Sequence, residues 1–481
     1  MSKTNAYTNA ITLSALSSQN GAGLTYEHKE QVINCLNLCS DTELSQNLAA
    51  VIVLIRLMIS YDEKARLVRC IKVFESGIGA YTGSDKNMMI ANYERFIGLA
   101  QYNNIAEMTK HFKIALAHSD GSFAGEERIG NWTFGSPSVL LMFHRESGKL
   151  SEELSDMLEG IPVYCKLTDG HGQGADFVME AEAKFNAGEF TEAETIIHKA
   201  WYYAREKDQW SIMITADFLR IRLLFIKGDW FGVVNIIKQT DELMEARKQS
   251  LLQHTFDMCK SYIYLLLDMP NKTSKWITEG DASQTLVMYP AKPALNIVYG
   301  RYLLATGEYA IACGIAEAAR ETASKFPNLL GIIYADIYLA AAHYALSRED
   351  EAKACLQSAL DAALPDNILI PFAENAGFIM DILNELSKDE HYAESIARIK
   401  NLYKEFEKGR KKIIREHFAP NLGGLNEKEM EVTWLAAQRL TNKAIGDRLS
   451  LSEGAVKSRL INVFKKLSIT KRDQLTEMLK L

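Results

Sequence analysis

The chain has 481 residues, of which 47% are hydrophobic, and can bury the cores of roughly two to four domains. Its formal net charge of -7 argues against a protein that coats nucleic acid over its whole surface, because phosphate binding needs a local excess of Lys and Arg. Such an excess does exist locally: from Leu425 onward there are 11 Lys or Arg and 7 Asp or Glu, a net charge of +4, which leaves -11 for the first 424 residues.

The cysteines and the apolar runs bear on the cellular compartment. The seven cysteines are odd in number and mostly far apart, unlike a disulfide framework. Cys35 and Cys39 stand one helical turn apart, but no second pair follows at zinc spacing, so we expect no metal and no other cofactor. The N-terminus lacks the apolar core of a signal peptide, and the longest apolar run, residues 48–55, is shorter than the ~20 residues that cross a bilayer. We expect a soluble, cytoplasmic protein without membrane contact.

Helical periodicity dominates the chain. Apolar residues recur at three- and four-residue intervals nearly throughout, with only nine prolines and few alternating stretches that would indicate strands. An all-α fold is therefore predicted. Residues 1–23, rich in Ser, Thr, Asn and Gly, are expected to be a flexible N-terminal segment.

Short polar turns between amphipathic segments repeat along residues 24–415. They fall near positions 61, 103, 148, 188, 228, 268, 307 and 347, at steps of 39 to 45 residues. The turn chemistry fits, because Gly can end a helix in the left-handed conformation and an acidic residue favours the start of the next helix. One helical hairpin cannot bury its own apolar face, so the repeat predicts an α-solenoid that acts as a sensor or docking array. The turns resemble those of tetratricopeptide repeats, although the usual repeat is about 34 residues.

Two stretches, residues 130–138 and 168–174, interrupt the repeat. The second is not a phosphate-binding loop, because no Lys-Ser/Thr follows its glycines and no strand precedes them. We interpret both as loops that join hairpins or line the inner face of the solenoid. The candidate ligand contacts in them are Trp132 and His171.

A basic cluster precedes a linker expected at residues 416–424. Such a charge run is usually a solvated helix face, and contact with DNA phosphates is the alternative. The cluster consists of Lys408, Arg410, Lys411, Lys412 and Arg415.

The last segment, residues 425–481, predicts four helices at about 427–437, 442–449, 453–467 and 471–480. Thr441 and Ser452 are suitable N-caps, and Thr470 followed by Asp473 is typical of a capping box. The second and third of these helices, which are joined by a turn at residues 450–452, form a helix-turn-helix.

The third of these helices has two contrasting sides. At 100° per residue, Val456, Leu460, Val463 and Leu467 face the core, and the opposite arc is short, polar and cationic. Lys and Arg can reach guanine acceptors or phosphates, and Asn can pair with adenine, so this arc suits the major groove. The candidate DNA-binding residues are Thr441, Asn442, Lys443, Ser452, Lys457, Ser458, Arg459, Ile461, Asn462, Lys465, Lys466 and Lys471.

These residues resemble the LuxR-type helix-turn-helix domain. The matches are Leu425, Glu429, Val432, Leu435, Asn442, Lys443, Ile445, Leu449, Ser452, Val456, Lys457, Lys466, Leu467 and Arg472. The resemblance implies that Lys457, Ser458 and Ile461 face bases and that the last helix mediates dimerisation on DNA. Four departures are Arg439 for a frequent Gly, Gly446 for a frequent Ala, Ala455 for a frequent Thr and Arg459 for a frequent His. We expect Gly446 to weaken its helix by roughly 1 kcal/mol relative to Ala, and Ile461, where Lys is common, to alter the affinity or the preferred site.

The combination of a helical-repeat sensor with this C-terminal domain resembles the MalT-like branch of the family. Residues 132–150 and 167–200 are similar to its sensor arm. Members usually begin with an ATP-binding module, but no G-x-x-x-x-G-K-[ST] motif occurs in this sequence. ATP-driven switching therefore cannot be carried over from the family to this chain.

The sequence thus predicts a DNA-binding transcriptional regulator. Its solenoid would sense a small-molecule or protein effector, and its C-terminal domain would bind double-stranded promoter DNA as a dimer, with RNA polymerase as a further candidate partner. The alternative is an α-solenoid protein–protein scaffold with a degenerate DNA-binding domain. We do not expect an enzyme, because no catalytic or metal-binding constellation stands out.

Overall fold

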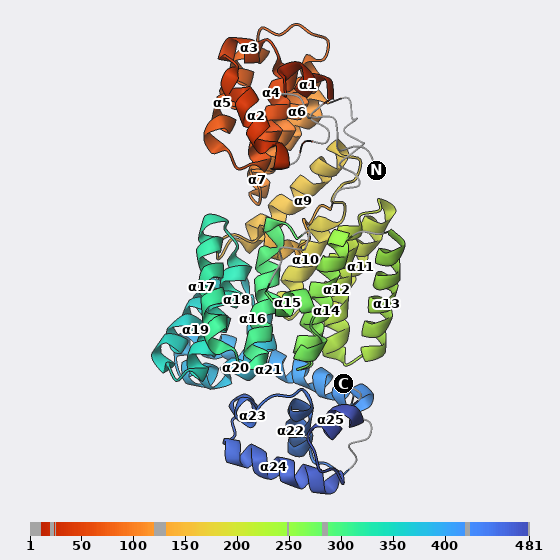
Figure 1. The fold of residues 1–481 in the computed structure, drawn as a ribbon, viewed down its shortest axis with the longest axis vertical. Coiled ribbons are helices and arrows are strands. Elements are labelled where there is room, and N and C mark those ends of the chain that lie inside the picture. Colours follow the sequence, from red (N-terminus) through yellow and green to blue (C-terminus); the bar gives the residue numbers. More distant parts are fainter. Residues whose placement is uncertain are drawn as a thin grey trace. The chain divides into compact units, whose positions relative to one another are not determined.

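The computed structural model describes residues 11–19, 24, 26–119, 131–247, 250–280, 287–418 and 424–479. Over these ranges the regular elements are all helices, which confirms the predicted all-α class (Figure 1). Contacts divide the chain into two compact units, of which unit 1 comprises Met1–Arg128 and Asp156–His171, and unit 2 comprises Ile129–Ser155 and Gly172–Leu481. None of the helices in the described ranges is long and apolar enough to cross a membrane.

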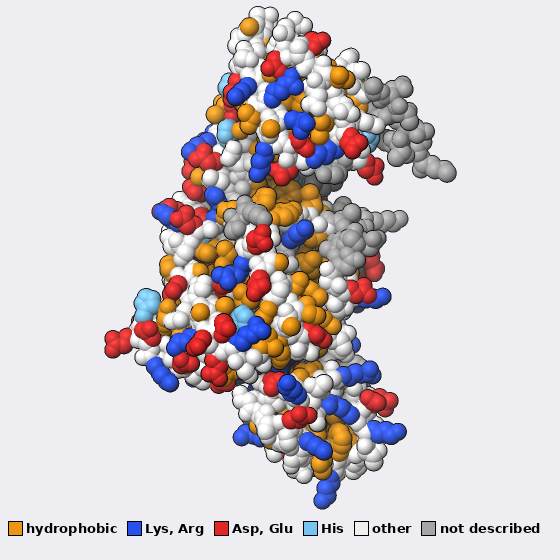
Figure 2. Space-filling model, turned by 60° about the vertical axis from the view of Figure 1, so that its left-hand side comes forward, with side chains coloured by type: hydrophobic (Ala, Val, Ile, Leu, Met, Phe, Trp, Pro, Cys, Tyr) orange, Lys and Arg blue, Asp and Glu red, His pale blue; other side chains and the backbone are white. Residues whose placement is uncertain are grey.

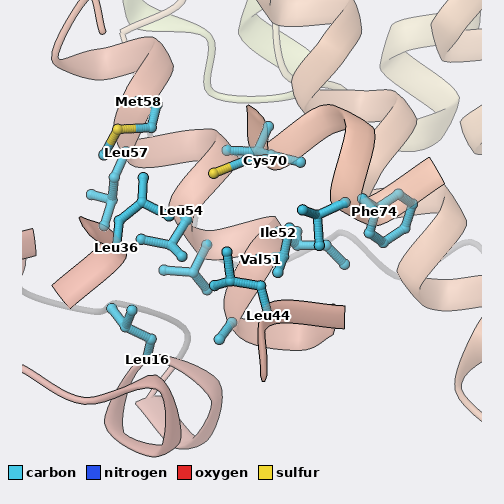
Figure 3. Packing of buried hydrophobic residues seen from close by; sticks show 14 of the residues in the cluster. Leu16, Leu36, Leu44, Val51, Ile52, Leu54, Leu57, Met58, Cys70 and Phe74 are labelled. Atoms are coloured by element: carbon cyan, nitrogen blue, oxygen red, sulfur yellow. The ribbon is translucent and has the colours of Figure 1, made fainter. Parts of the chain in front are cut away.

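Unit 1 has its core around an almost wholly apolar helix, α4. Figure 3 shows side chains such as Leu16, Leu36 and Phe74 packed around those of α4. Burial of this apolar surface is the main force that holds the unit together. The helices of unit 1 are α1 (Leu13–Gln19), α2 (Lys29–Leu38), α3 (Asp41–Ser45), α4 (Leu48–Ser60), α5 (Lys64–Ile78), α6 (Lys86–Ala100), α7 (Ile105–His118) and the C-terminal part of α9 (Leu150–Leu167).

Helix α1 corrects the prediction of a flexible N-terminal segment. Residues 13–19 of that segment are helical, and Leu16 is only 1% exposed within the core cluster. Its spaced apolar residues decide the structure here, although the surrounding composition is polar. Residues 1–10 and 20–23 of the segment lie outside the described residues.

Unit 2 contains most of the repeat array and four C-terminal helices, α22 (Glu427–Ala437), α23 (Asn442–Leu449), α24 (Glu453–Lys466) and α25 (Asp473–Met478). Its array begins with α8 (Val139–Phe143) and the N-terminal part of α9. Further helices are α10 (Ala175–Asn186), α11 (Phe190–Glu206), α12 (Trp210–Lys227), α13 (Trp230–Arg247), α14 (Ser250–Leu266), α15 (Lys275–Thr278), α16 (Lys292–Thr306), α17 (Tyr309–Lys325), α18 (Leu329–Ala345), α19 (Glu349–Ala363), α20 (Ile370–Leu386) and α21 (Glu390–Ile413). A π-helix, Ile414–Phe418, continues α21, so the first residues of the expected linker are helical. Residues 419–423 of the linker lie outside the described residues.

The eight turns found by their spacing share one backbone feature. Each contains a residue with positive φ, and the next helix begins two residues later, as a 3-10 helix (Pro270–Lys272) after Asp268 and as an α-helix after the others. A residue in this left-handed conformation stops one helix and reverses the chain. The repeat therefore has a common physical basis, and the solenoid prediction is confirmed. These residues are Asp62, Asn103, Gly148, Gly188, Gly228, Asp268, Gly307 and Ser347.

Within unit 2, the end of the array returns to its beginning. The Leu369 amide donates to the Asn186 carbonyl at 2.8 Å, and α21 packs on α12. Gly409 makes this approach possible, because a Cβ there would lie 2.3 Å from the Ile226 carbonyl oxygen. The helices α10–α21 thus close on themselves and position α21 next to the C-terminal helices, which lie below it in Figure 1.

The interior of this closed array contains a buried polar cluster. Glu374, which is 4% exposed, accepts hydrogen bonds from Arg222 Nη2 at 2.9 Å and from the Tyr262 hydroxyl at 2.5 Å. Buried charges require such partners. The inner face of unit 2 is therefore lined in part by a satisfied ion pair rather than by apolar side chains alone.

Candidate nucleic-acid interface

Four helices form the C-terminal part of unit 2: α22 (Glu427–Ala437), α23 (Asn442–Leu449), α24 (Glu453–Lys466) and α25 (Asp473–Met478). The first three agree with the predicted ranges to within one residue. The Thr441 hydroxyl accepts from the Ala444 amide and the Ser452 hydroxyl from the Ala455 amide, each at 3.1 Å. Both predicted N-caps are confirmed.

The start of α25 differs from the prediction. The helix begins at Asp473 and its N-cap residue makes no side-chain capping bond. The Gln474 side chain instead accepts from the Thr470 and Lys471 amides, both at 2.9 Å. The expected capping box between Thr470 and Asp473 is therefore wrong, because the amide side chain one residue later takes the acceptor role.

One side of helix α24 packs against the rest of the domain. Val456, Leu460 and Val463 are buried and pack on α22, as the periodicity predicts. Leu467, expected in the same row, lies just beyond the last helical residue and is only half-buried. The apolar row fixes the rotation of α24 about its axis.

The opposite side of α24 is open to solvent. Five side chains on this side are exposed, including Ile461 at 60%. Figure 2 shows Lys and Arg side chains gathered over this C-terminal end of unit 2. We call this surface the reading face, and it consists of Lys457, Ser458, Ile461, Asn462 and Lys465.

The other candidate DNA-binding residues are less uniform. Lys443 and Lys471 are exposed, and Arg459 is half-buried. Lys466 forms an ion pair with Glu429 at 2.5 Å, which ties α24 to the start of α22. This bond, together with the Asn426 amide, lowers the pKa of Glu429. Lys466 thus has a structural partner that the sequence did not reveal.

Arg472 holds the helix ends together. Its guanidinium group donates to the Ala436 carbonyl at 3.0 Å, to the Leu440 carbonyl, and to Asn442 Oδ1 at 3.1 Å. These bonds reach one carbonyl at the end of α22 and one in the turn between α22 and α23, where helical partners are missing. They also orient Asn442, so this candidate contact is partly engaged inside the domain. Sequence matching had identified Arg472 only as a family position.

Two departures from the family pattern occupy demanding positions. Arg439 has φ of 65°, a conformation that glycine adopts without strain. Gly446 lies close to the following turn, since a Cβ there would be 2.5 Å from the Leu451 carbonyl oxygen. Helix propensity alone predicts that Gly446 weakens α23, but the structure adds an opposing effect, because this close approach leaves little room for a side chain.

The α22–α23 side of the domain packs on the repeat helices of the same unit. The Trp434 indole, 2% exposed, donates from Nε1 to the Leu267 carbonyl at 2.8 Å. Arg448 forms an ion pair with Asp268, and its guanidinium carbon lies 4.7 Å from the Phe378 ring centroid. We call Trp434 and Arg448, with the repeat residues that they contact, the docking face.

Electrostatics make Asp268 central to this docking face. The carboxylate pairs with Arg448 from α23 and with Arg410 from α21. Burial lowers the pKa of Arg448 to about 9, because desolvation penalises its charged form. The carboxylate offsets that penalty. Periodicity marked Asp268 only as a turn residue, and nothing in the sequence pointed to its two partners.

The basic cluster of α21 is not simply a solvated helix face. Besides its bond to Asp268, Arg410 pairs with Glu407 at 3.1 Å, and Lys411 pairs with Glu431 of α22, also at 3.1 Å. Lys408, Lys412 and Arg415 remain exposed. The cluster therefore serves partly to position the C-terminal helices.

The two candidate ligand contacts of the repeat region are both buried, at 8% exposure. Trp132 stacks on Phe143 with ring centroids 5.5 Å apart. His171 Nδ1 lies 2.8 Å from the Tyr164 hydroxyl. These contacts favour structural roles for both side chains. No group of three or more metal-binding side chains occurs in the described ranges, and none of the seven cysteines forms a disulfide bond.

Comparison with known proteins agrees with this geometry. Residues 424–479 match the family of bacterial regulatory proteins of the luxR type. No curated protein matches the chain. The match covers α22–α25 and supports a DNA-binding transcriptional regulator. Residues 424–479 are therefore a LuxR-type helix-turn-helix domain, joined in this chain to an α-helical repeat array.

Proposed function

We propose that this chain regulates transcription by reading promoter DNA in the major groove with α24. The observation that carries the proposal is the reading face, which is exposed while the opposite side of the same helix is buried. Lys457 can reach guanine acceptors or a phosphate, and Asn462 can form paired hydrogen bonds with adenine. An exposed Ile461 can contact a thymine methyl group.

The start of α23 supplies the phosphate contacts. Free amides at a helix N-terminus and the positive end of its dipole favour an anion. Thr441 and Lys443 are exposed there, and Lys471 lies exposed before α25. Such contacts fix the register of the domain on the duplex without reading sequence.

Assembly and signal input complete the proposal. The protein binds DNA as a dimer through α25, so its operator contains two half-sites separated by about one helical turn. The repeat array senses a small-molecule or protein effector, as in the MalT-like branch that it resembles, and RNA polymerase is a further candidate partner. The proposed location is the cytoplasm.

Selection of bound DNA from a random pool, followed by fluorescence anisotropy, tests the proposal. We expect Lys457→Ala combined with Asn462→Ala to weaken specific binding by roughly 10- to 1,000-fold and to reduce the salt slope by about one. Lys238→Ala is the control, since Lys238 is 74% exposed on α13, outside the DNA-binding domain. Absence of any selected sequence, or equal affinity of the double variant and the wild type, would refute the proposal.

A protein–protein scaffold is the second candidate. Phe231 on α13 is 80% exposed and Tyr202 on α11 is 60% exposed, and exposed aromatic side chains can contribute to protein interfaces. Capture of protein partners by the full chain, together with no promoter occupancy in cells, would favour this function. Promoter occupancy that is lost in the Lys457→Ala and Asn462→Ala double variant would exclude it as the sole function.

A further inference from the structure

A cavity of about 750 Å³ lies within unit 2, where α22 and α23 meet α14, α16, α20 and α21. This volume is in the range of sites for small organic ligands. Charged side chains dominate the lining, with eight Arg or Lys and four Asp or Glu. The cavity therefore carries a net charge of +4 in a chain whose net charge is -7.

Two guanidinium groups of the lining have unused donors. Arg301, 3% exposed, donates from Nη1 to the Glu374 carbonyl, but the structure describes no acceptor for its Nε. Arg448 pairs with Asp268, yet its Nη1 is also buried without a described acceptor. A buried donor without an acceptor is costly, so these atoms mark two guanidinium groups whose hydrogen-bonding capacity the described residues do not fill.

The two arginines approach one aromatic ring. The guanidinium carbons of Arg301 and Arg448 lie 5.7 and 4.7 Å from the centroid of the Phe378 ring. Arg301 comes from α16 of the repeat array, and Arg448 comes from α23 of the helix-turn-helix. A single ligand at this ring can therefore contact both parts of unit 2.

Lysines of α21 add positive charge at the solvent side of the cavity. Lys404, Lys408 and Lys412 follow each other at four-residue intervals, so they lie on one face of the helix. All three are exposed and line the cavity. Within the described ranges, neither Lys408 nor Lys412 has an acidic partner, so both are available to an incoming anion.

We propose that this cavity binds a small organic phosphate with two or more negative charges. The buried guanidinium groups of Arg301 and Arg448 hold the phosphate oxygens, because their planar forks match phosphate geometry, and the exposed lysines of α21 attract it. The bound anion links α16 to α23, so occupancy and docking of the DNA-binding domain stabilise each other. The cavity is thereby the site of the sensing role proposed above, and the inference deepens that role.

Isothermal titration of the full chain tests the site without DNA, with pyrophosphate, ATP and citrate as separate probes. We expect pyrophosphate and ATP to bind with a Kd below about 1 mM, and citrate to bind more weakly. Lys404→Ala combined with Lys408→Ala should weaken pyrophosphate binding about tenfold, because both side chains are exposed and their loss removes attraction rather than packing. Lys238→Ala, which removes the same charge from an exposed helix, should bind as the wild type does.

A second variant tests the buried anchor. Arg448→Lys keeps the charge but loses the planar fork, so it should bind pyrophosphate more weakly than the wild type while circular dichroism stays unchanged. No saturable binding of pyrophosphate or ATP would overturn the proposal, as would equal affinities in the wild type and the Lys404/Lys408 double variant. Tighter binding of citrate would overturn the assignment to phosphate.

DNA binding is measured separately, which keeps the two proposals apart. If the wild type binds selected DNA but not pyrophosphate, the organic-phosphate site is wrong and the regulator remains. Loss of DNA affinity in the Lys404/Lys408 double variant, without pyrophosphate binding by the wild type, would assign these lysines to DNA and refute the site.

Discussion

The reading face and the docking face lie on the same small domain but differ in exposure and in bonding. Lys457, Ser458 and Asn462 of the reading face are exposed, whereas the buried residues of α24 lie on the opposite side of the helix. Trp434 and Arg448 of the docking face are largely shielded from solvent and pair with Leu267 and Asp268, which lie far away in the sequence. The difference teaches that the reading face is exposed to solvent, whereas the docking face has its main protein partners within the chain.

The largest effect on stability is expected from neutralising the carboxylate of Asp268 at the docking face. Asp268→Asn leaves Arg410 and Arg448 buried without their shared carboxylate, and we expect a loss of about 3–5 kcal/mol in unfolding free energy. Asn tolerates the left-handed backbone at this position, so the change reports on charge. Guanidinium unfolding measures it. Glu242→Gln, at an exposed ion pair on α13, should change stability by less than about 1 kcal/mol, and equal losses would contradict the buried role of Asp268.

A smaller effect on stability is expected where α23 meets the turn that precedes α24. Gly446→Ala places a methyl group against the Leu451 carbonyl, and we expect a loss of about 1–3 kcal/mol despite the better helix propensity of alanine. Gly454→Ala is the matched control, because its Cβ would meet nothing within 4 Å. Thermal unfolding compares the two. A gain in stability at residue 446 would show that the turn can relax.

On the reading face itself, Ile461→Lys adds a positive charge at a position where the family often has Lys. Ile461 is 60% exposed, so folding should be unaffected. We expect DNA affinity to rise severalfold at low salt and the salt slope to increase by about one, as each new phosphate contact releases a counterion. Anisotropy at several salt concentrations measures both quantities, and an unchanged slope would place residue 461 away from phosphates.

The smallest effect is expected at Arg439, where α22 ends. Arg439→Gly should stabilise the domain by about 1 kcal/mol, because glycine adopts φ of 65° without strain. Arg439→Ala keeps the strain and should not stabilise. Chemical denaturation measures the free energy of unfolding of both variants. Identical values for the two would mean that the loss of the Arg side chain, and not relief of backbone strain, determines the change in stability.

Much of the fold could be predicted because its signals are local. A left-handed turn residue and the apolar period of each helix involve neighbours in the sequence, so the repeat turns at Gly188 and Gly228 could be found from their polar residues and their regular spacing. The burial of α1 was missed, since Leu16 acquires its partners from α4, which follows later in the chain. The division into two compact units left no compositional mark.

The candidate site divides in the same way. Helical geometry placed Val456 inside and Asn462 outside, as the structure confirms. It could not pair Lys466 with Glu429 or Trp434 with Leu267, because these partners are 37 and 167 residues apart. Contacts of that kind depend on how whole helices pack, and no single periodic segment encodes them.

Lysine-reactivity footprinting of the full chain, with and without selected DNA, tests the central claim that α24 reads DNA. Bound DNA should lower the acetylation rates of Lys457 and Lys465 at least about tenfold, because phosphates and bases would enclose both ammonium groups. Lys238 on α13 should react equally in both states. Unchanged reactivity of Lys457 and Lys465 in a complex that demonstrably holds DNA would contradict the account.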